Sequence, residues 1–238
     1  MKAQSVRLSI PVLALLLAAC ASGGRPATPD AMTFTHPHHS VHRDGDDLLS
    51  AGLGMAGLRT PMAPTFADPE QPTAAELRRR ALWTSWRGIA DLRPGGVGEA
   101  YGSLDAVPGR EFHALARLPG ARHPHRVMVQ LPDAFDAAKP CLVVTASSGS
   151  RGIYGSIAVA GGWGLPRGCA VAYTDKGAGS DYFDLDAGVG IDAAGQTGAD
   201  REHAVFAPEV AEGASGVAFA HAHSQDNPEA DWGRHVRQ

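Results

Sequence analysis

The stretch of residues 141–179 constrains the fold more than any other part of the chain. Its first apolar run, residues 142–144, is too short for a helix and rich in β-branched residues, so it predicts a buried strand. A loop of small residues follows at 147–152, and then a segment that favours a helix until a proline and a glycine end it. A second apolar run occupies residues 170–173. Strand, glycine loop, helix and strand form a βαβ unit, which predicts parallel strands in an α/β sheet.

Two motifs within this unit resemble a known family. The motifs are TASSGSRGIYG, which starts at Thr145, and WGLPRGCAVAYTDKGAG, which starts at Trp163. Both closely resemble the 3-hydroxybutyrate oligomer hydrolases, also called hydroxybutyrate-dimer hydrolases, and a looser similarity covers most of the chain beyond its N-terminal leader. The resemblance implies a serine esterase of the α/β-hydrolase type. Such an enzyme would cleave small esters, the dimers and oligomers of 3-hydroxybutyrate, to monomers and would need no cofactor.

We therefore expect an α/β fold with a partial, α/β-hydrolase-like, mostly parallel sheet and flanking helices. The nucleophile of such enzymes lies in a G-x-S-x-G elbow or a variant of it, with the acid and the base later in the chain. The near match SGSRG, at Ser148, has serine in place of the first glycine and follows the wrong strand. By the resemblance, nucleophile, acid and base lie beyond Gln238. We expect an N-terminal part of an esterase, truncated before the elbow and inactive alone.

The loop after the first strand of the unit carries the candidate site residues. In α/β-hydrolases one N–H group of the oxyanion hole comes from the loop after the third strand, and the resemblance puts Ser148, Gly149 and Ser150 there. Glycine would let backbone N–H groups approach a developing oxyanion closely. The alternative is a tight turn that uses small residues for its backbone and for capping. Arg151 is a candidate for holding a substrate carboxylate by a bidentate contact, although we favour an ordinary surface ion pair. We assign no catalytic residue and no metal ligand.

The N-terminus has the pattern of a bacterial export signal. Lys2 and Arg7 precede an apolar core at residues 8–19, which is too short to span a bilayer. The core ends in Leu-Ala-Ala before Cys20, the pattern at which lipoprotein signal peptidase cuts and a lipid is attached to the cysteine. Ordinary cleavage at an A-x-A site is the alternative. We expect an outer-membrane lipoprotein or a periplasmic protein, with release to the outside as the other possibility.

The chain then divides into an export signal over residues 1–20, a tether with loops over 21–72, and the hydrolase-like part over 73–238. A capping box at Thr73 predicts a helix to about Ile89, and residues 112–117 and 126–131 predict two strands. The histidines between residues 36 and 42 favour solvated side chains over a metal site. The acidic stretch 177–213 favours a solvated loop over a calcium site.

Composition limits the partners. The chain has 21 basic and 25 acidic residues and a net charge of −4, which gives no footprint for nucleic acid. The expected partner is a small-molecule ester, with a membrane involved only through the lipid anchor. Cys141 and Cys169 begin neighbouring strands, where two buried thiols are favoured over a disulfide because parallel strands seldom offer suitable geometry. A second hypothesis is a non-enzymatic surface lipoprotein that acts as a binding or interaction module.

Overall fold

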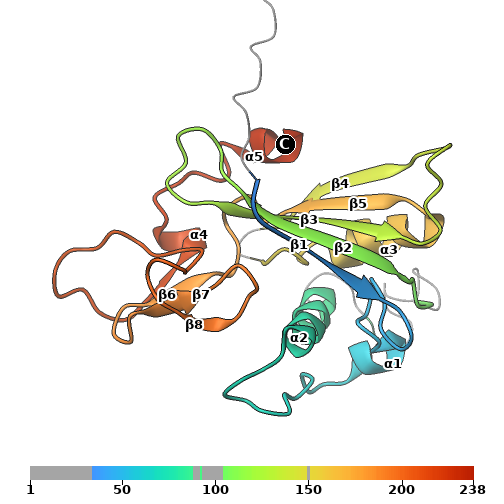
Figure 1. Cartoon of the computed structure of the whole chain (residues 1–238), viewed down its shortest axis with the longest axis horizontal. Helices are drawn as coiled ribbons and strands as arrows, with labels where there is room; N and C mark the ends of the chain where they lie inside the picture. Colours follow the sequence, from blue (N-terminus) through green and yellow to red (C-terminus); the bar gives the residue numbers. More distant parts are fainter. Residues whose placement is uncertain (1–33, 88–91, 93–103, 149–150) are drawn as a thin grey trace, which may run out of the picture. The chain divides into compact units, whose positions relative to one another are not determined.

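A computed structural model of the chain describes residues 34–87, 92, 104–148 and 151–238. The predicted export signal with Cys20 lies outside these residues, as do Gly149 and Ser150. The described residues form two β-sheets with short helices around them (Figure 1).

The main sheet has five strands in the order β1-β2-β3-β5-β4. The strands are β1 (Phe34–His42), β2 (Gly109–Ala116), β3 (His125–Pro132), β4 (Leu142–Ala146) and β5 (Ala170–Thr174). Neighbours β1–β2, β2–β3 and β3–β5 are antiparallel, and only β4 and β5 run parallel. The predicted βαβ unit therefore exists, but it is joined to an antiparallel meander.

The expectation of a mostly parallel, α/β-hydrolase-like sheet is wrong. A parallel pair needs a long crossover. The chain has long helical connections from β1 to β2 and from β4 to β5, but only the second joins parallel strands. The connection from β2 to β3 covers residues 117–124 and returns the chain as an antiparallel hairpin. The prediction of one βαβ unit is correct. It does not extend to the whole sheet, because the direction of each strand pair depends on the path of the chain between its two strands.

The second sheet is small and entirely antiparallel. Its strands, in the order β8-β7-β6-β9, are β6 (Tyr182–Asp184), β7 (Val189–Ile191), β8 (Thr197–Ala199) and β9 (Val217–Phe219). A solvated loop had been expected over most of this stretch, and that expectation is wrong. The Asp184 carboxylate accepts two backbone N–H groups in the turn after β6, and the Asp192 carboxylate accepts one after β7. These acidic residues build turns between strands too short to show a clear alternation.

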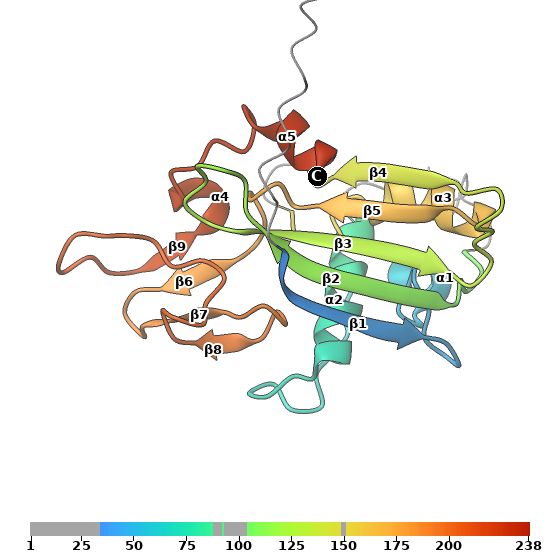
Figure 2. The same cartoon turned by 45° about the horizontal axis from the view of Figure 1, so that its top comes forward.

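Helices cover one face of the main sheet (Figure 2). They are α1 (Gly54–Arg59), α2 (Ala74–Arg87) and the crossover from β4 to β5, which consists of η2 (Ile157–Gly161), α3 (Gly162–Gly164) and η3 (Leu165–Arg167). The predicted capping box opens α2, since Thr73 N–H and hydroxyl both donate to Glu76 Oε2. Leu82 and Trp86 of α2 are fully buried in the core between helices and sheet.

The part of residues 21–72 that the structure describes is more ordered than the expected tether. It contributes β1, α1 and three fully buried leucines, Leu48, Leu49 and Leu58. The strand escaped detection because most of its side chains are exposed, so it has no apolar alternation to reveal it. Two short helices complete the chain after β9, α4 (Ala220–His223) and α5 (Trp232–Arg237).

Candidate functional site

The loop at the carboxyl ends of β4 and β5 is held by hydrogen bonds to backbone carbonyls. Ser147 N–H donates to the Thr174 carbonyl at 2.8 Å, and its hydroxyl donates to the carbonyl of Gly152. The Ser156 hydroxyl, beyond the loop, donates to the Ala146 carbonyl at 2.7 Å. These bonds hold the loop against both strand ends. Carboxyl ends of strands are where open α/β sheets bind ligands.

Of the predicted oxyanion residues, Ser148 is exposed at the start of this loop, and Gly149 and Ser150 lie outside the described residues. Their role stays a prediction. It also loses its main support, because it assumed the third strand of an α/β-hydrolase sheet. Arg151 is turned toward α2, where its Nη2 donates to the Ser85 carbonyl at 2.7 Å and the Thr84 carbonyl at 3.2 Å. These carbonyls belong to the last helical turn, which has no intrahelical donors for them. Arg151 thus caps α2, and its contact with substrate stays a prediction.

Asp175 and Lys176 follow β5 and lie beside the same loop. The Asp175 carboxylate accepts the N–H groups of Arg126 and Gly177, each at 3.0 Å. Burial, with a further contribution from Asp181, raises the pKa of Asp175 to about 6. Lys176 is fully buried, and its Nζ lies 2.7 Å from Glu229 Oε1 and 4.8 Å from the centre of the Trp232 ring. Both residues therefore fasten neighbouring segments together.

A pair of buried histidines joins α5 to the start of β3. The rings of His125 and His235 meet edge to face with centroids 4.4 Å apart. Neither nitrogen of His125, nor Nδ1 of His235, has a hydrogen-bond partner among the described residues. Burial lowers the pKa of each histidine to about 4. At neutral pH the rings are uncharged and pack as small aromatic groups.

Three side chains in and after β1 are connected in the order of a serine-hydrolase triad. Ser40 Oγ lies 2.7 Å from His42 Nε2, and His42 Nδ1 lies 2.7 Å from Asp46 Oδ2. Glu111 Oε2 is also 3.5 Å from His42 Nε2. Burial alone would lower the pKa of His42, but its hydrogen bonds to Asp46 and Glu111 raise it. In a serine-hydrolase triad the ring nitrogen that faces the serine has no carboxylate beside it, whereas here Glu111 lies next to His42 Nε2 and competes for the proton that Ser40 would give.

Glu111 lies at the centre of a larger network that includes Ser40, His42 and Asp46. It is fully buried and accepts both a bidentate contact from Arg78, at 2.8 and 3.0 Å, and the Tyr154 hydroxyl, at 2.7 Å. Burial alone would raise its pKa, but the hydrogen bonds from His113 and His42 and the charge of Arg78 hold it well below its ordinary value. The network links β1, β2 and α2 to the segment after the β4 loop. Sequence reasoning missed it, because the predicted strand began at Phe112 and left Glu111 outside it.

A cavity of about 500 Å³ lies beside this network. Its lining includes four aspartates, Asp44, Asp46, Asp47 and Asp133. Arg43 reaches Asp133 through two hydrogen bonds of 2.6 and 2.7 Å, so the one arginine in the lining is already paired. Carboxylates repel one another, so this cavity does not suit a substrate that carries its own carboxylate.

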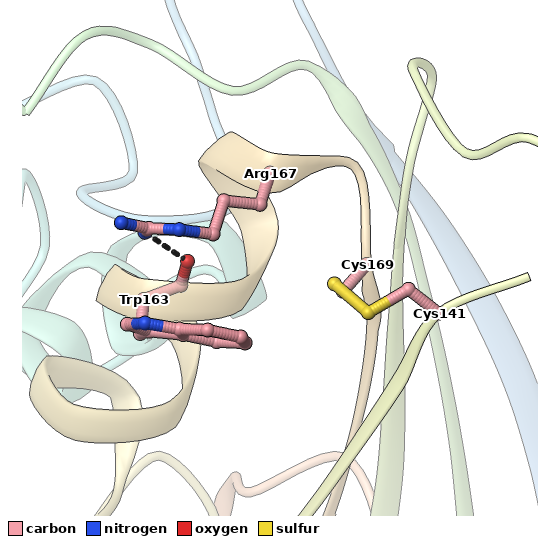
Figure 3. The surroundings of a disulfide bond; sticks show 4 residues. All are labelled: Cys141, Trp163, Arg167 and Cys169. Carbon is pink, nitrogen blue, oxygen red and sulfur yellow. Dashed lines mark hydrogen bonds between the residues drawn. A yellow bond between two sulfur atoms is a disulfide. The ribbon is translucent and has the colours of Figure 1, made fainter.

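Cys141 and Cys169 form a disulfide, which corrects the expectation of two thiols (Figure 3). They stand at the amino ends of the parallel strands, with Cα atoms 4.5 Å apart. The cysteines lie just before the paired strand residues Leu142 and Ala170, where the chain directions are less constrained than inside the ladder. The bond closes a loop that contains the whole crossover. Its helical part carries the exposed Trp163, whose ring faces the guanidinium of Arg167.

Among residues 34–87, 92, 104–148 and 151–238, no group of three or more histidine, cysteine or acidic side chains is placed to hold a metal ion. Within the same ranges no helix has the length and apolarity to cross a membrane.

The chain is similar to curated hydrolases. It is 40% identical over 260 residues to the D-(-)-3-hydroxybutyrate oligomer hydrolase of Burkholderia thailandensis. The alignment covers 97% of this chain and 37% of that protein. It is 43% identical over 265 residues to the protein of the same name from Cupriavidus metallidurans, covering 97% of this chain and 36% of the relative. The chain thus spans little more than a third of the length of the relatives it matches. No solved structure matches it at a significant level.

These relatives define a class of hydrolases that act on hydroxybutyrate oligomers. The family described as 3HB-oligomer hydrolase (3HBOH) matches residues 16–238, and the chain belongs to this family. The resemblance found in the two motifs of the βαβ unit is thereby confirmed.

Proposed function

We propose that the chain works as part of a carboxylic ester hydrolase that cleaves dimers and oligomers of 3-hydroxybutyrate to monomers. The observation that carries this proposal is the match to relatives bearing that name over 97% of the chain. The substrate is a small-molecule ester. The alternative of a non-enzymatic binding module has no comparable support.

Within such an enzyme, this chain supplies a scaffold and the nucleophile comes from elsewhere in the polypeptide. Its sequence has no G-x-S-x-G elbow. The hydrogen-bonded series Ser40–His42–Asp46 is held by Glu111 and Arg78 as an ion network, which supports a structural role for it. The chemistry proposed is serine ester hydrolysis, in which a hydroxyl attacks the ester carbonyl and an oxyanion forms.

The test compares three proteins on 3-hydroxybutyrate dimer. They are this chain, the C. metallidurans relative, and a chimera in which this chain replaces the matched segment of that relative. We expect hydrolysis by the relative and by the chimera, and none by the chain alone, since removal of a triad leaves only weak residual catalysis. A serine-directed phosphonate should label the chimera outside residues 1–238. Phosphonate-sensitive turnover by the chain alone, with the label on one of its serines, would contradict the scaffold role.

We further propose that the chain is exported and anchored by a lipid on Cys20. The Cys141–Cys169 disulfide supports export, because disulfides persist in oxidising compartments. Radiolabelled palmitate fed to the exporting host should label the protein, and Cys20→Ser should abolish the label. Export without any label would leave ordinary cleavage, with a periplasmic or released product, as the answer.

A further inference from the structure

One face of the main sheet is left largely uncovered by the described residues, and its side chains are mostly apolar, with His39 and Arg110 among them. Helices α1, α2 and α3 all lie on the other face, and α5 sits only at one end of the uncovered one (Figure 2). One row of paired residues crosses all five strands on this open face. The row consists of His39, Phe112, Val129, Ala172 and Val144. Val144 is 47% exposed, and its neighbour Leu142, two residues earlier on the same face, is 63% exposed. We call these six residues the open-face row.

The adjacent row on the covered face has the opposite character. It consists of Ser40, Glu111, Gln130, Val171 and Val143, and its Glu111 and Gln130 are fully buried and hydrogen-bonded to each other. An antiparallel sheet with one solvated face normally turns polar side chains to water and apolar ones inward. This sheet buries the polar side chains of Glu111 and Gln130 in one row and exposes the apolar side chains of Phe112, Val129 and Val144 in the next. That arrangement suits a sheet that is covered on both faces in the working protein.

The outer edge of β4 is unprotected as well. Among the described residues, β4 pairs with β5 alone, so one row of its backbone N–H and C=O groups has no strand partner. Residues 142–146 contain no proline and no charge, the usual devices that keep such an edge from pairing. The open edge borders the open-face row at Val144 and Leu142.

We propose that the open-face row and the β4 edge form the docking surface for the part of a 3HB-oligomer hydrolase polypeptide that this chain does not cover. The matched region is 36–37% of the two relatives, so nearly two thirds of each polypeptide is available to form a covering layer. Gln238 follows α5 at one end of the same face, so a chain continuing from it would need no long connection. The occupant presents an apolar layer to the row and a strand to β4.

The test uses co-expression of the full 238-residue chain with the tagged, unmatched remainder of the C. metallidurans relative. The positive control is the matched third of that relative expressed with the same remainder. Val144→Lys and Val129→Lys place a charge in the open-face row. Val159→Lys is the matched control, because Val159 is 53% exposed but lies in η2, away from that face. Circular dichroism and the thermal midpoint of each purified variant check that it folds.

We expect stoichiometric co-purification of the unsubstituted chain and of V159K. The amount recovered with V144K or V129K should fall about tenfold or more, because a lysine charge would be buried against an apolar layer. The proposal is overturned if V144K and V129K co-purify as well as V159K, or if the relative's own third binds the remainder and this chain does not. Absence of binding in both pairs also overturns it.

A discrete dimer of the chain alone that V144K dissociates would make a second copy the occupant instead. The readout is binding, so the proposed function can fail separately. A complex without ester hydrolysis would count only against the activity, and hydrolysis by a V144K chimera with unchanged kcat/KM would count only against the docking surface.

Discussion

Glu111 shows how a single buried charge can organise several elements. Its carboxylate receives donors from Arg78 on α2, from Gln130 on β3 and from Tyr154 after the β4 loop. A buried ion pair contributes little net free energy relative to apolar residues, but breaking one side leaves an uncompensated charge. The role of Glu111 is therefore to fix where α2 and the β4 loop sit on the sheet.

Glu111→Gln should lower the free energy of unfolding by up to about 3–5 kcal/mol, since Arg78 would stay buried with only the partly exposed Asp46 to balance its charge. Urea unfolding followed by circular dichroism measures this. Asp133→Asn is the control, because the Arg43–Asp133 pair is largely exposed and should contribute little to stability. Equal effects of the two substitutions would show that Glu111 does not hold a buried charge in place.

The His125–His235 pair should make the docking of α5 sensitive to acid. In the folded chain both pKa values lie at about 4, whereas histidine in an unfolded chain titrates at about 6.5. The folded state thus binds fewer protons between these values. Stability from this contact is complete above about pH 6.5 and is lost as the pH falls toward 4.

Hydrogen exchange of residues 232–237, corrected for intrinsic rates, should show less protection at pH 5 than at pH 7.5. The double substitution His125→Phe and His235→Phe should reduce this difference, and His221→Phe, at an exposed histidine, should not. A difference that survives the double substitution would assign the acid response to other groups.

At the scale of elements, the β4–β5 crossover is the feature that the sequence described best. Both strands, the loop between them and their parallel direction follow from apolar runs and glycines that are local in the chain. The disulfide was not predicted, because it depends on how two strand ends approach each other. It closes a loop of 28 residues around the crossover.

Replacing both cysteines, Cys141→Ser with Cys169→Ser, should lower the free energy of unfolding by about 3–4 kcal/mol through the entropy of the longer open chain. Thermal unfolding with and without reductant provides the measurement. The unsubstituted chain should lose the same amount on reduction, while the double variant should not respond. A wild-type chain with two reactive thiols at these positions after export would rule the bond out.

At the scale of the molecule, Arg126 connects the two sheets. From β3 its guanidinium makes two 3.0 Å hydrogen bonds to Asp181, and it donates to the carbonyls of Asp192 and Ala193 beside β7. Five donors in a fixed fork suit this set of acceptors, which lysine could not satisfy.

Arg126→Lys should therefore loosen the second sheet while leaving the main sheet folded. A loss of about 1.4 kcal/mol in local stability should make limited proteolysis within residues 182–219 about tenfold faster. Arg122→Lys is the control, because its contact with Glu209 is exposed and 3.9 Å long. Unchanged cleavage in the Arg126 variant would show that apolar contacts alone hold the second sheet.

The sequence by itself determined the family, the βαβ unit, the capped helix α2 and the strands β2 and β3, because each depends on residues close together in the chain. Tertiary structure decided the direction of the strands, the place of β1 at the far edge and the small sheet built from turn-forming aspartates. It also decided the candidate site. Arg151 became a helix cap and Ser40 part of an ion network because of partners such as Ser85 and Glu111, which are distant in sequence. Local patterns specify elements, whereas long-range contacts choose which polar groups are paired and which face of a sheet is left open.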